Sequence, residues 1–257
     1  MSILFADSNC DLTAKQAKQF GIEYINMPFS CADDKIENVS VEFFVNFFTP
    51  YLEQKNDLVY VHDGVRFFSS FQNLRKAVKQ LKESFPDNTI TLVNSGSTSC
   101  GYAYIVYQSM LKYRTGCSDS TLVNYIKKVK SETVSLFSLN TTNNLKEYTD
   151  LIKVDNPLIK PIIKYEDDKF EVIDKVTNRK KLYSSIISAI EKHGENVADY
   201  PVFISYTGTD TDANELQVEL EKYLGHNVKI LINPMNPYDA HYIGNKALAI
   251  SFHKKTN

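Results

Sequence analysis

The stretch Ile3-Leu-Phe-Ala-Asp-Ser-Asn9 decides the fold, because an apolar run of strand length ends there in a polar turn. The residues that follow, Leu12 to Phe20, have the spacing of a helix that stops at Gly21. A buried strand followed directly by a helix is the repeating unit of a parallel sheet covered by helices. The start of the chain therefore predicts an α/β fold.

The same alternation continues through the first half of the chain. Further strands are predicted at residues 22–29, 58–61 and 90–93. Helices are predicted from a Ser40 cap to just before Pro50, over residues 71–85, from about residue 102 to 113, and from a Ser118 cap to about residue 130. The loops at 7–9, 63–70 and 94–101 each follow a predicted strand, at the sheet edge where ligands bind in such folds. We therefore expect these loops to meet in space.

The second half has a different pattern. Residues 158–163 and 170–176 flank the acidic turn 166–168 and predict an antiparallel hairpin. Helices are predicted at 180–192 and, after an Asp210 or Asp212 cap, up to Leu224 and Gly225; strands are predicted at 202–206, 228–232 and 247–252. The chain thus predicts an N-terminal parallel-sheet α/β domain, residues 1–133, and a C-terminal mixed-sheet α/β domain, residues 134–257.

Composition excludes several classes of protein. The 257 residues are 43% hydrophobic, which is enough for a real core and excludes a disordered chain. Lys and Arg number 29 against 31 Asp and Glu, so the formal net charge of −2 does not suit a general nucleic-acid binder. Arginine occurs at four positions, which disfavours a site built on arginine clusters, namely Arg66, Arg75, Arg114 and Arg179.

The compartment is expected to be cytoplasmic. The N-terminus lacks the charged and apolar pattern of a secretory signal, and no apolar run reaches the ~18 residues of a membrane span. The cysteines form no C-x-x-C pair and are expected to be buried or idle thiols; they are Cys10, Cys31, Cys100 and Cys117.

The loop 94–101 is the first candidate for chemistry. Ser97, Ser99 or Cys100 could serve as the nucleophile of a small hydrolase or transferase, although the glycine spacing of a nucleophile elbow is missing. The loop also lacks the glycine patterns of dinucleotide and P-loop sites. Its other interpretation is helix capping by Ser97, Thr98 or Ser99.

The histidines do not predict a metal site. Two histidines stand near an aspartate, His62 beside Asp63 and His241 near Asp239, but neither pair has the spacing of a known metal-ligand set. Neither a metal nor a cofactor is therefore expected. His241 is placed in a polar turn before the last strand, where it is either an ordinary loop residue or a functional one. The remaining three histidines are expected to be solvent-exposed, namely His193, His226 and His253.

A lipid ligand fits the loops better than these chemistries do. The loops supply hydroxyls and helix-start amides that could bind an anionic head group. An apolar tail would gain roughly 0.8 kcal/mol per buried methylene. A Phe-rich helix, with Phe43, Phe44, Phe47 and Phe48 on one face, either forms core or lines a tunnel for that tail. The hydroxyls are those of Ser8, Ser69, Ser70, Ser95, Ser97 and Thr98.

Several segments, in order along the chain, resemble the DegV family of bacterial fatty-acid-binding proteins. Ala6-Asp-Ser-Asn-Cys-Asp-Leu12 is similar to the family's first-strand signature, and Val93-Asn-Ser95 to its later Asp-Ser loop, with Asn94 in place of Asp. Residues 158–163 and 175–181 resemble its Asn-Ile-Lys-Pro-Ile segment and the basic stretch after it. Residues 239–252 resemble its closing His-x-Gly-Pro-Gly-Ala-Leu-Gly motif.

The resemblance implies a two-domain fold that holds a fatty acid between its domains. It implies a non-catalytic carrier that presents the carboxylate to a separate fatty-acid kinase, and we expect a monomer or weak dimer. The basic stretch at Arg179 is either a solvated helix start or a surface that faces an acidic or phosphate-bearing partner. The positions implied for the fatty acid are Ser69, Ser70, Asn94, Ser95, Thr98, His241, Tyr242 and Gly244.

The chain departs from the family at several of its motifs. The Thr-Ser-Gln-Pro loop is missing, Phe68 replaces the usual serine, and the segment around Leu145 lacks the family's arginine. Either His241 or Tyr242 takes the position of the family histidine, depending on one inserted residue before Gly244. Another reading of the sequence is a degenerate DegV-like module that binds a different apolar ligand.

Overall fold

The protein is described here from a computed structural model, which covers residues 2–32, 35–64, 68–139, 159–166 and 169–255. The predicted segment around Leu145 lies outside these residues, as does the start of the predicted strand at 158. The expected α/β fold, with a parallel sheet and a mixed sheet, is confirmed.

The first sheet has the strand order β2-β1-β5-β6 and all its pairs are parallel. Its strands are β1 (Ile3–Asp7), β2 (Glu23–Ile25), β5 (Leu58–His62) and β6 (Ile90–Asn94). The apolar runs predicted for β1, β5 and β6 are these strands, because strands covered on both faces are apolar throughout. β2 is shorter than the predicted 22–29, and the chain then forms a small hairpin, β3 (Cys31–Ala32) with β4 (Lys35–Ile36), that was not predicted.

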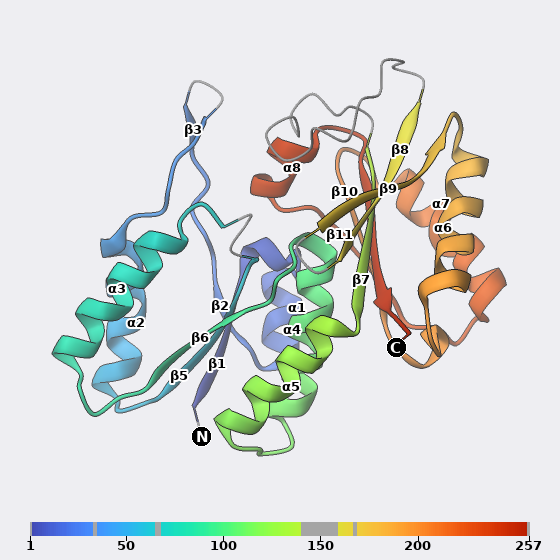
Figure 1. Cartoon of the computed structure of the whole chain (residues 1–257). Helices are drawn as coiled ribbons and strands as arrows, with labels where there is room; N and C mark the ends of the chain where they lie inside the picture. Colours follow the sequence, from blue (N-terminus) through green and yellow to red (C-terminus); the bar gives the residue numbers. More distant parts are fainter. Residues whose placement is uncertain (1, 33–34, 65–67, 140–158, 167–168, 256–257) are drawn as a thin grey trace.

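Helices cover both faces of this sheet (Figure 1). α2 (Val41–Glu53) and α3 (Phe71–Ser84) lie together on one face, and α1 (Ala14–Phe20), α4 (Ser99–Tyr113) and α5 (Asp119–Ser131) lie on the other. The prediction that α2 ends before Pro50 is wrong, since the helix continues to Glu53. The added turn buries Leu52 and places the Tyr51 ring 5.0 Å from Phe5, contacts that offset the backbone bond lost at proline.

The second sheet is mixed, with the order β11-β10-β12-β7-β8-β9. β10 and β11 are parallel, and the other neighbouring pairs are antiparallel. The strands are β7 (Thr133–Ser138), β8 (Lys160–Glu166), β9 (Lys169–Val176), β10 (Val202–Tyr206), β11 (Ile230–Pro234) and β12 (Leu248–His253). β7 lies inside this sheet and was not predicted. α6 (Arg179–His193) and α7 (Thr211–Leu224) cover one of its faces (Figure 1).

α4 joins the two halves of the molecule. It contacts β1 of the first sheet and β7, β10 and β12 of the second, so it lies between the sheets. Because both sides of this helix are covered, its residues from Ser99 to Val106 are all buried. The domain boundary predicted between residues 133 and 134 remains a prediction; it falls at the first residue of β7.

Two predictions for histidines need correction. His253 is buried, because it lies on the inner strand β12, where its ring stacks on Tyr200 with centroids 3.9 Å apart. His193, at the end of α6, is half-buried, whereas His226 is exposed as expected. The partners of His253 are distant in sequence, so the local polar composition gave no sign of its burial.

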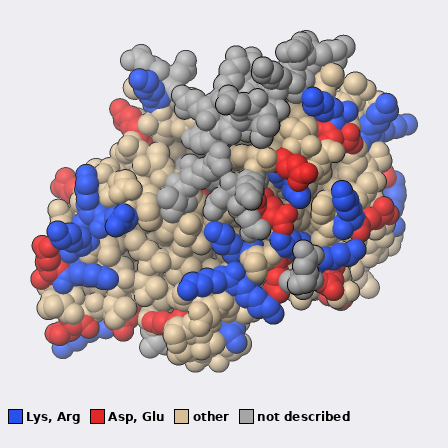
Figure 2. All heavy atoms as spheres, viewed as in Figure 1, with Lys and Arg blue, Asp and Glu red and all other residues tan. Residues whose placement is uncertain are grey.

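The surface carries both signs of charge. Figure 2 shows basic and acidic side chains interspersed over the face in view. Among the described residues, no helix has both the length and the apolar character needed to cross a membrane.

Candidate functional site

The three loops expected to meet at the edge of the parallel sheet do meet. The backbone amide of Gly64 donates to the carbonyl of Ser97 (2.8 Å), and that of Ser95 donates to the carbonyl of His62 (3.1 Å). The side-chain amide of Asn9 donates to the Asp63 carboxylate (3.4 Å). The ends of β1, β5 and β6 therefore converge on one place, as parallel strands require.

The two serines before α3 have different environments. Ser69 is exposed, whereas Ser70 is buried and its Oγ accepts a hydrogen bond from the backbone amide of Val39 (2.8 Å). Ser70 thus ties the start of α3 to the residues before α2. Phe68, in place of the family serine, is 3% exposed and packs against Phe44 with ring centroids 6.3 Å apart. This departure from the family motif adds to the aromatic core.

The loop after β6 is held by its own side chains. Asn94 accepts from the amide of Gly96 (2.9 Å), and the buried Ser95 hydroxyl donates to the carbonyl of Ser97 (3.0 Å). Gly96 has a left-handed φ of 62°, and a side chain there would collide with Lys130. These contacts fix the loop in a compact turn at the start of α4.

α4 begins at Ser99, earlier than the predicted Tyr102, and Thr98 is its N-cap residue. The expected side-chain cap is absent at Thr98, because its hydroxyl donates to the Asp239 carboxylate instead (2.9 and 2.7 Å). Ser99 and Cys100 are fully buried. Burial raises the pKa of the Cys100 thiol, which is the opposite of what a cysteine nucleophile requires.

His241 lies on a helix, so its predicted placement in a polar turn is wrong. The short helix α8 (Pro237–Ile243) begins with Pro237 after the N-cap Asn236, and Gly244, with a φ of 84°, ends it. His241 and Tyr242 are both half-buried, with ring centroids 5.4 Å apart. The Nδ1 atom of His241 is 3.9 Å from the sulfur of Cys31, on the β3–β4 hairpin. The Gly244 carbonyl accepts from the Thr207 hydroxyl (2.8 Å).

A cluster of buried carboxyls lies between the converging loops and α8. These carboxyls belong to Asp7, Asp11, Asp63 and Asp239. Burial raises the pKa of Asp7 and of Asp11 to about 6 and that of Asp239 to about 7, and it also raises that of Asp63. The hydroxyls of Tyr60 and Tyr102 donate to Asp7 (2.6 and 3.1 Å) and partly offset its desolvation.

The sequence analysis did not find this cluster. Asp7 also braces the first loop, since its Oδ1 accepts from the backbone amide of Asn9 (2.9 Å). A signal was present in the sequence, because Asp7 and Asp63 directly follow the strands β1 and β5. Asp239 stands three residues after Asn236, the spacing of a helix cap and its partner.

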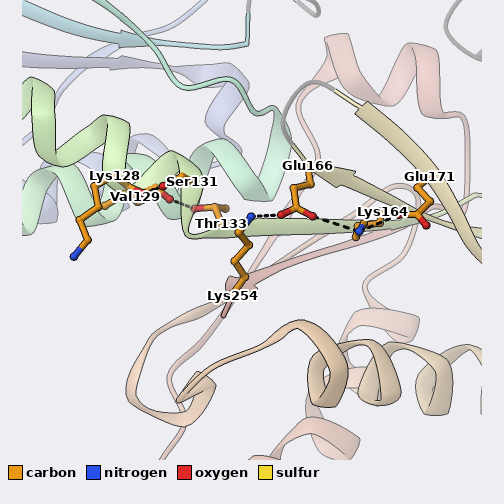
Figure 3. A network of polar contacts seen from close by, with 8 residues as sticks. All are labelled: Lys128, Val129, Ser131, Thr133, Lys164, Glu166, Glu171 and Lys254. Atoms are coloured by element: carbon orange, nitrogen blue, oxygen red, sulfur yellow. Dashed lines mark hydrogen bonds and ion pairs between the residues drawn. The ribbon is translucent and has the colours of Figure 1, made fainter. Parts of the chain in front are cut away.

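The back of the 95–97 loop faces the second sheet. Ser95, Gly96 and Ser97 line a small pocket together with Tyr165 and Glu166 of β8. Beside it, Glu166 pairs with Lys254, and Lys164 lies 3.3 Å from Glu166 and 2.9 Å from Glu171 (Figure 3). Burial opposes ionisation of Glu166, but its bonds to Lys254 and Lys164 lower the pKa overall. These ion pairs link the residue after β12 to β8 and β9.

Arg179 lies apart from the loops. It is the first residue of α6, and its guanidinium is 2.6 Å from Asp212 and 3.9 Å from Glu215 of α7. α6 and α7 cover one face of the second sheet, whereas α4 contacts the sheet from the side of the loops. Among the predicted positions, Thr98 contacts α8 through Asp239, whereas Arg179 lies on α6, away from the loops.

The Phe-rich face of α2 is divided between core and partly exposed positions. Phe44 and Phe48 are fully buried, and Phe43 and Phe47 are half-buried. On the neighbouring α3, the Phe71 ring lies 5.0 Å from that of His62 at the end of β5. Aromatic rings thus continue from the core to the edge of the sheet where the loops converge. Among the described residues, no group of three or more His, Cys, Asp or Glu side chains could hold a metal ion.

Comparison with known proteins identifies the family. The sequence model of the DegV family matches residues 32–255. A DegV domain-containing protein of Clostridium perfringens is 22% identical over 254 residues, which cover 86% of this chain and 87% of the relative.

Solved structures share the fold. A protein of Eubacterium ventriosum described as stearic acid-binding superposes with a TM-score of 0.86 at 18% identity, over 99% of each chain. A DegV family protein of Eubacterium eligens loaded with heptadecanoic acid gives a TM-score of 0.79 at 16% identity, over 99% of this chain and 100% of its own. By the extent and agreement of these matches, the chain belongs to the DegV family.

Proposed function

We propose that this protein binds a long-chain fatty acid between its two sheets, as a non-catalytic carrier. The observation that carries the proposal is the likeness, over nearly the whole chain, to DegV proteins described as binding stearic acid and heptadecanoic acid. The ligand itself is then the only bound group, with no metal or cofactor required.

The head group is proposed to lie where the loops meet α8. The proposed site takes Asn94, Ser95 and Thr98 from the loop after β6, and His241 and Tyr242 from α8. The proposed site also includes two serines at the start of α3, Ser69 and Ser70, and the glycine that ends α8, Gly244. A carboxylate is well matched by hydroxyl and amide donors, whose hydrogen bonds to a charged acceptor are stronger than neutral ones. Of the two aromatic candidates, only His241 can donate as a cation.

The acyl tail is proposed to lie along apolar side chains near the same loops. The half-buried rings of Phe43, Phe47 and Phe71 are available beside the fully buried core of α2 and α3. Each methylene removed from water contributes roughly 0.8 kcal/mol, so a long chain needs few further polar contacts.

The carrier is further proposed to act in the cytoplasm, as a monomer or weak dimer, and to present its fatty acid to a separate kinase. This step rests on the family resemblance, because the chain's own candidate, Arg179, is already paired with Asp212 and Glu215. A kinase would have to compete with these pairs, or bind elsewhere. The kinase step is tested by adding ATP and a fatty-acid kinase that works with DegV proteins to the fatty-acid-loaded protein. Acyl phosphate is the expected product.

Binding is tested by extracting the purified protein with organic solvent and identifying the extracted acids by mass spectrometry. A long-chain fatty acid in near-stoichiometric amount supports the proposal. A protein that yields no lipid and takes up neither oleate nor palmitate contradicts it. A sterol or an aromatic acid in the extract would instead favour a module for another apolar ligand.

A further inference from the structure

The side chain of Asn236 bonds to both halves of the molecule. Its amide nitrogen lies 2.8 Å from Asp11 Oδ1, 2.9 Å from the carbonyl of Asn9 and 2.7 Å from Asp239 Oδ2. Its amide oxygen accepts from the backbone N–H of Asp239 (2.9 Å), and its own backbone N–H donates to Asp11 Oδ1 (2.7 Å). Asn236 is 5% exposed, so these bonds are sheltered from water.

These contacts fix the start of α8 against the first loop of the parallel sheet. Asn9 and Asp11 belong to the turn that follows β1, more than 220 residues before Asn236. The neighbouring bond from Thr98 to Asp239 ties the same helix turn to the start of α4. α8 is seven residues long and carries His241 and Tyr242 in its second half. A helix this short owes its position to tertiary contacts rather than to its own stability.

We propose that Asn236 is a positioning residue: its neutral amide holds α8 in register with the loops, so that His241 and Tyr242 face the head-group position. This inference rests on the proposed function. Asn236 need not touch the fatty acid, because it acts through the placement of the helix. Thr98 supports the same placement through Asp239.

An amide suits this position because its surroundings are rich in oxygen. A carboxylate at position 236 would set an oxygen, in place of the donor, against Asp11 Oδ1, Asp239 Oδ2 and the carbonyl of Asn9. Burial, together with the nearby Asp11 and Asp7, raises the pKa of Asp239 to about 7, although hydrogen bonds from Thr98 and Asn236 act to lower it. The titratable groups around the cluster are Asp7 and Tyr60 on the first sheet, Cys10 and Asp11 after β1, Asp63 after β5, Cys100 and Tyr102 on α4, and Asp239 on α8.

The test is Asn236→Asp with Asn178→Asp as its matched control. Aspartate caps a helix as well as asparagine does, so both substitutions keep the cap acceptor. Asn178 caps α6 by accepting from the Lys181 amide (3.0 Å). Because Asn178 is exposed, a carboxylate at this position would not be buried against other oxygen atoms. Only the substitution at 236 exchanges a buried donor for an acceptor.

Affinity for a fluorescent C18 fatty acid is measured for each variant relative to wild type, at about pH 5.5 and about pH 7.5. For Asn236→Asp we expect a loss of about tenfold or more at the higher pH, with most of it recovered at the lower pH, where the protonated carboxyl donates again. Asn178→Asp should stay within about twofold at both pH values. Recovery by protonation separates the amide's role from a general loss of packing.

Hydrogen exchange of the α8 amides gives a readout that needs no ligand. In Asn236→Asp they should exchange faster at the higher pH than in wild type, and the amides of α6 should not change. If wild type binds no fatty acid, the proposed function fails, and this measurement alone decides whether Asn236 positions α8.

The proposal is overturned if Asn236→Asp binds as wild type does with unchanged exchange, or loses the same affinity at both pH values. Should Asn236→Asp not fold at the higher pH, Asn236→Ser replaces it. Serine also caps a helix, but its short side chain does not reach Asp11. Asn236→Ser should therefore lose affinity at both pH values, and wild-type affinity in that variant would contradict the proposal.

Discussion

The hydroxyl of Thr98 lies 2.9 and 2.7 Å from the two carboxylate oxygens of Asp239, so one threonine joins the start of α4 to the first turn of α8. Thr98 is 2% exposed and Asp239 is 5% exposed. Asp239 Oδ2 also accepts from Asn236, so loss of the Thr98 hydroxyl leaves Oδ1 as the buried oxygen that loses its donor, whereas the isosteric change of threonine to valine adds no void.

Thr98→Val should therefore lower the free energy of unfolding by about 1–3 kcal/mol, measured by urea denaturation at neutral pH. Thr49→Val is the control. The Thr49 hydroxyl donates to the carbonyl of Val45 within its own helix (2.8 Å), so its loss removes no hydrogen bond from a buried carboxyl. Equal losses in the two variants would mean that the bond to Asp239 has no special weight.

The stability of the folded protein should fall as pH rises from about 6.5 to about 8. Burial raises the pKa of Asp239 to about 7 and also raises that of Asp63, so both hold their protons to higher pH when folded than when unfolded. The stability they contribute is present below the ordinary pKa of 3.8 and is lost as pH rises through the raised value. His62 has the opposite effect on stability, because burial lowers its pKa to about 4. Its contribution increases as pH rises toward the ordinary value of 6.5 and changes no further above it.

Urea midpoints measured across that pH range test this trend, and Asp239→Asn should flatten it. Asp87→Asn makes the same change at an exposed position after α3 and should leave the slope as it is in wild type. A wild-type midpoint that rises with pH over this range would show that the buried carboxyls are ionised at little cost.

Restoring the family serine at Phe68 should destabilise the protein. Phe68→Ser removes a buried ring that packs against Phe44 and lies 6.0 Å from the ring of His62, at an expected cost of about 3–5 kcal/mol. Phe29→Ser, at a ring that is 39% exposed, should cost less than about 1.5 kcal/mol. Equal urea midpoints for the two variants would contradict the placement of Phe68 in the core.

Cys31 should be the fastest-reacting thiol of the folded protein. It is exposed, whereas Cys10 and Cys100 are fully buried and burial raises the pKa of both thiols. Ellman's reagent should give a fast phase that Cys31→Ser abolishes and that remains in Cys117→Ser, where a half-buried thiol is removed. A fast phase that survives Cys31→Ser would show that another thiol reacts fastest and would contradict this prediction.

Much of the fold could be predicted because its signals are local. The apolar runs of β1, β5 and β6 and the caps Ser40 and Ser118 needed no knowledge of distant residues. The meeting of the loops then followed from the rule that parallel strands end at one edge.

The unpredicted parts depend on contacts between distant residues. α8 is too short for periodicity to reveal, and its start is fixed by Asp11, on the other half of the chain. Asp239 is likewise matched by Thr98 across 141 residues. Such pairs leave no trace in local composition. The convergence of the loops could therefore be predicted from the strand order, but the carboxyl cluster between them could not.

Binding of a fatty acid is the central claim, and mass spectrometry tests it most directly. Native spectra of the purified protein should show one added mass that matches a long-chain fatty acid, at close to one per chain, and lipid-free protein should regain that mass when incubated with oleate or palmitate. A spectrum of the bare chain both before and after that incubation would contradict the account.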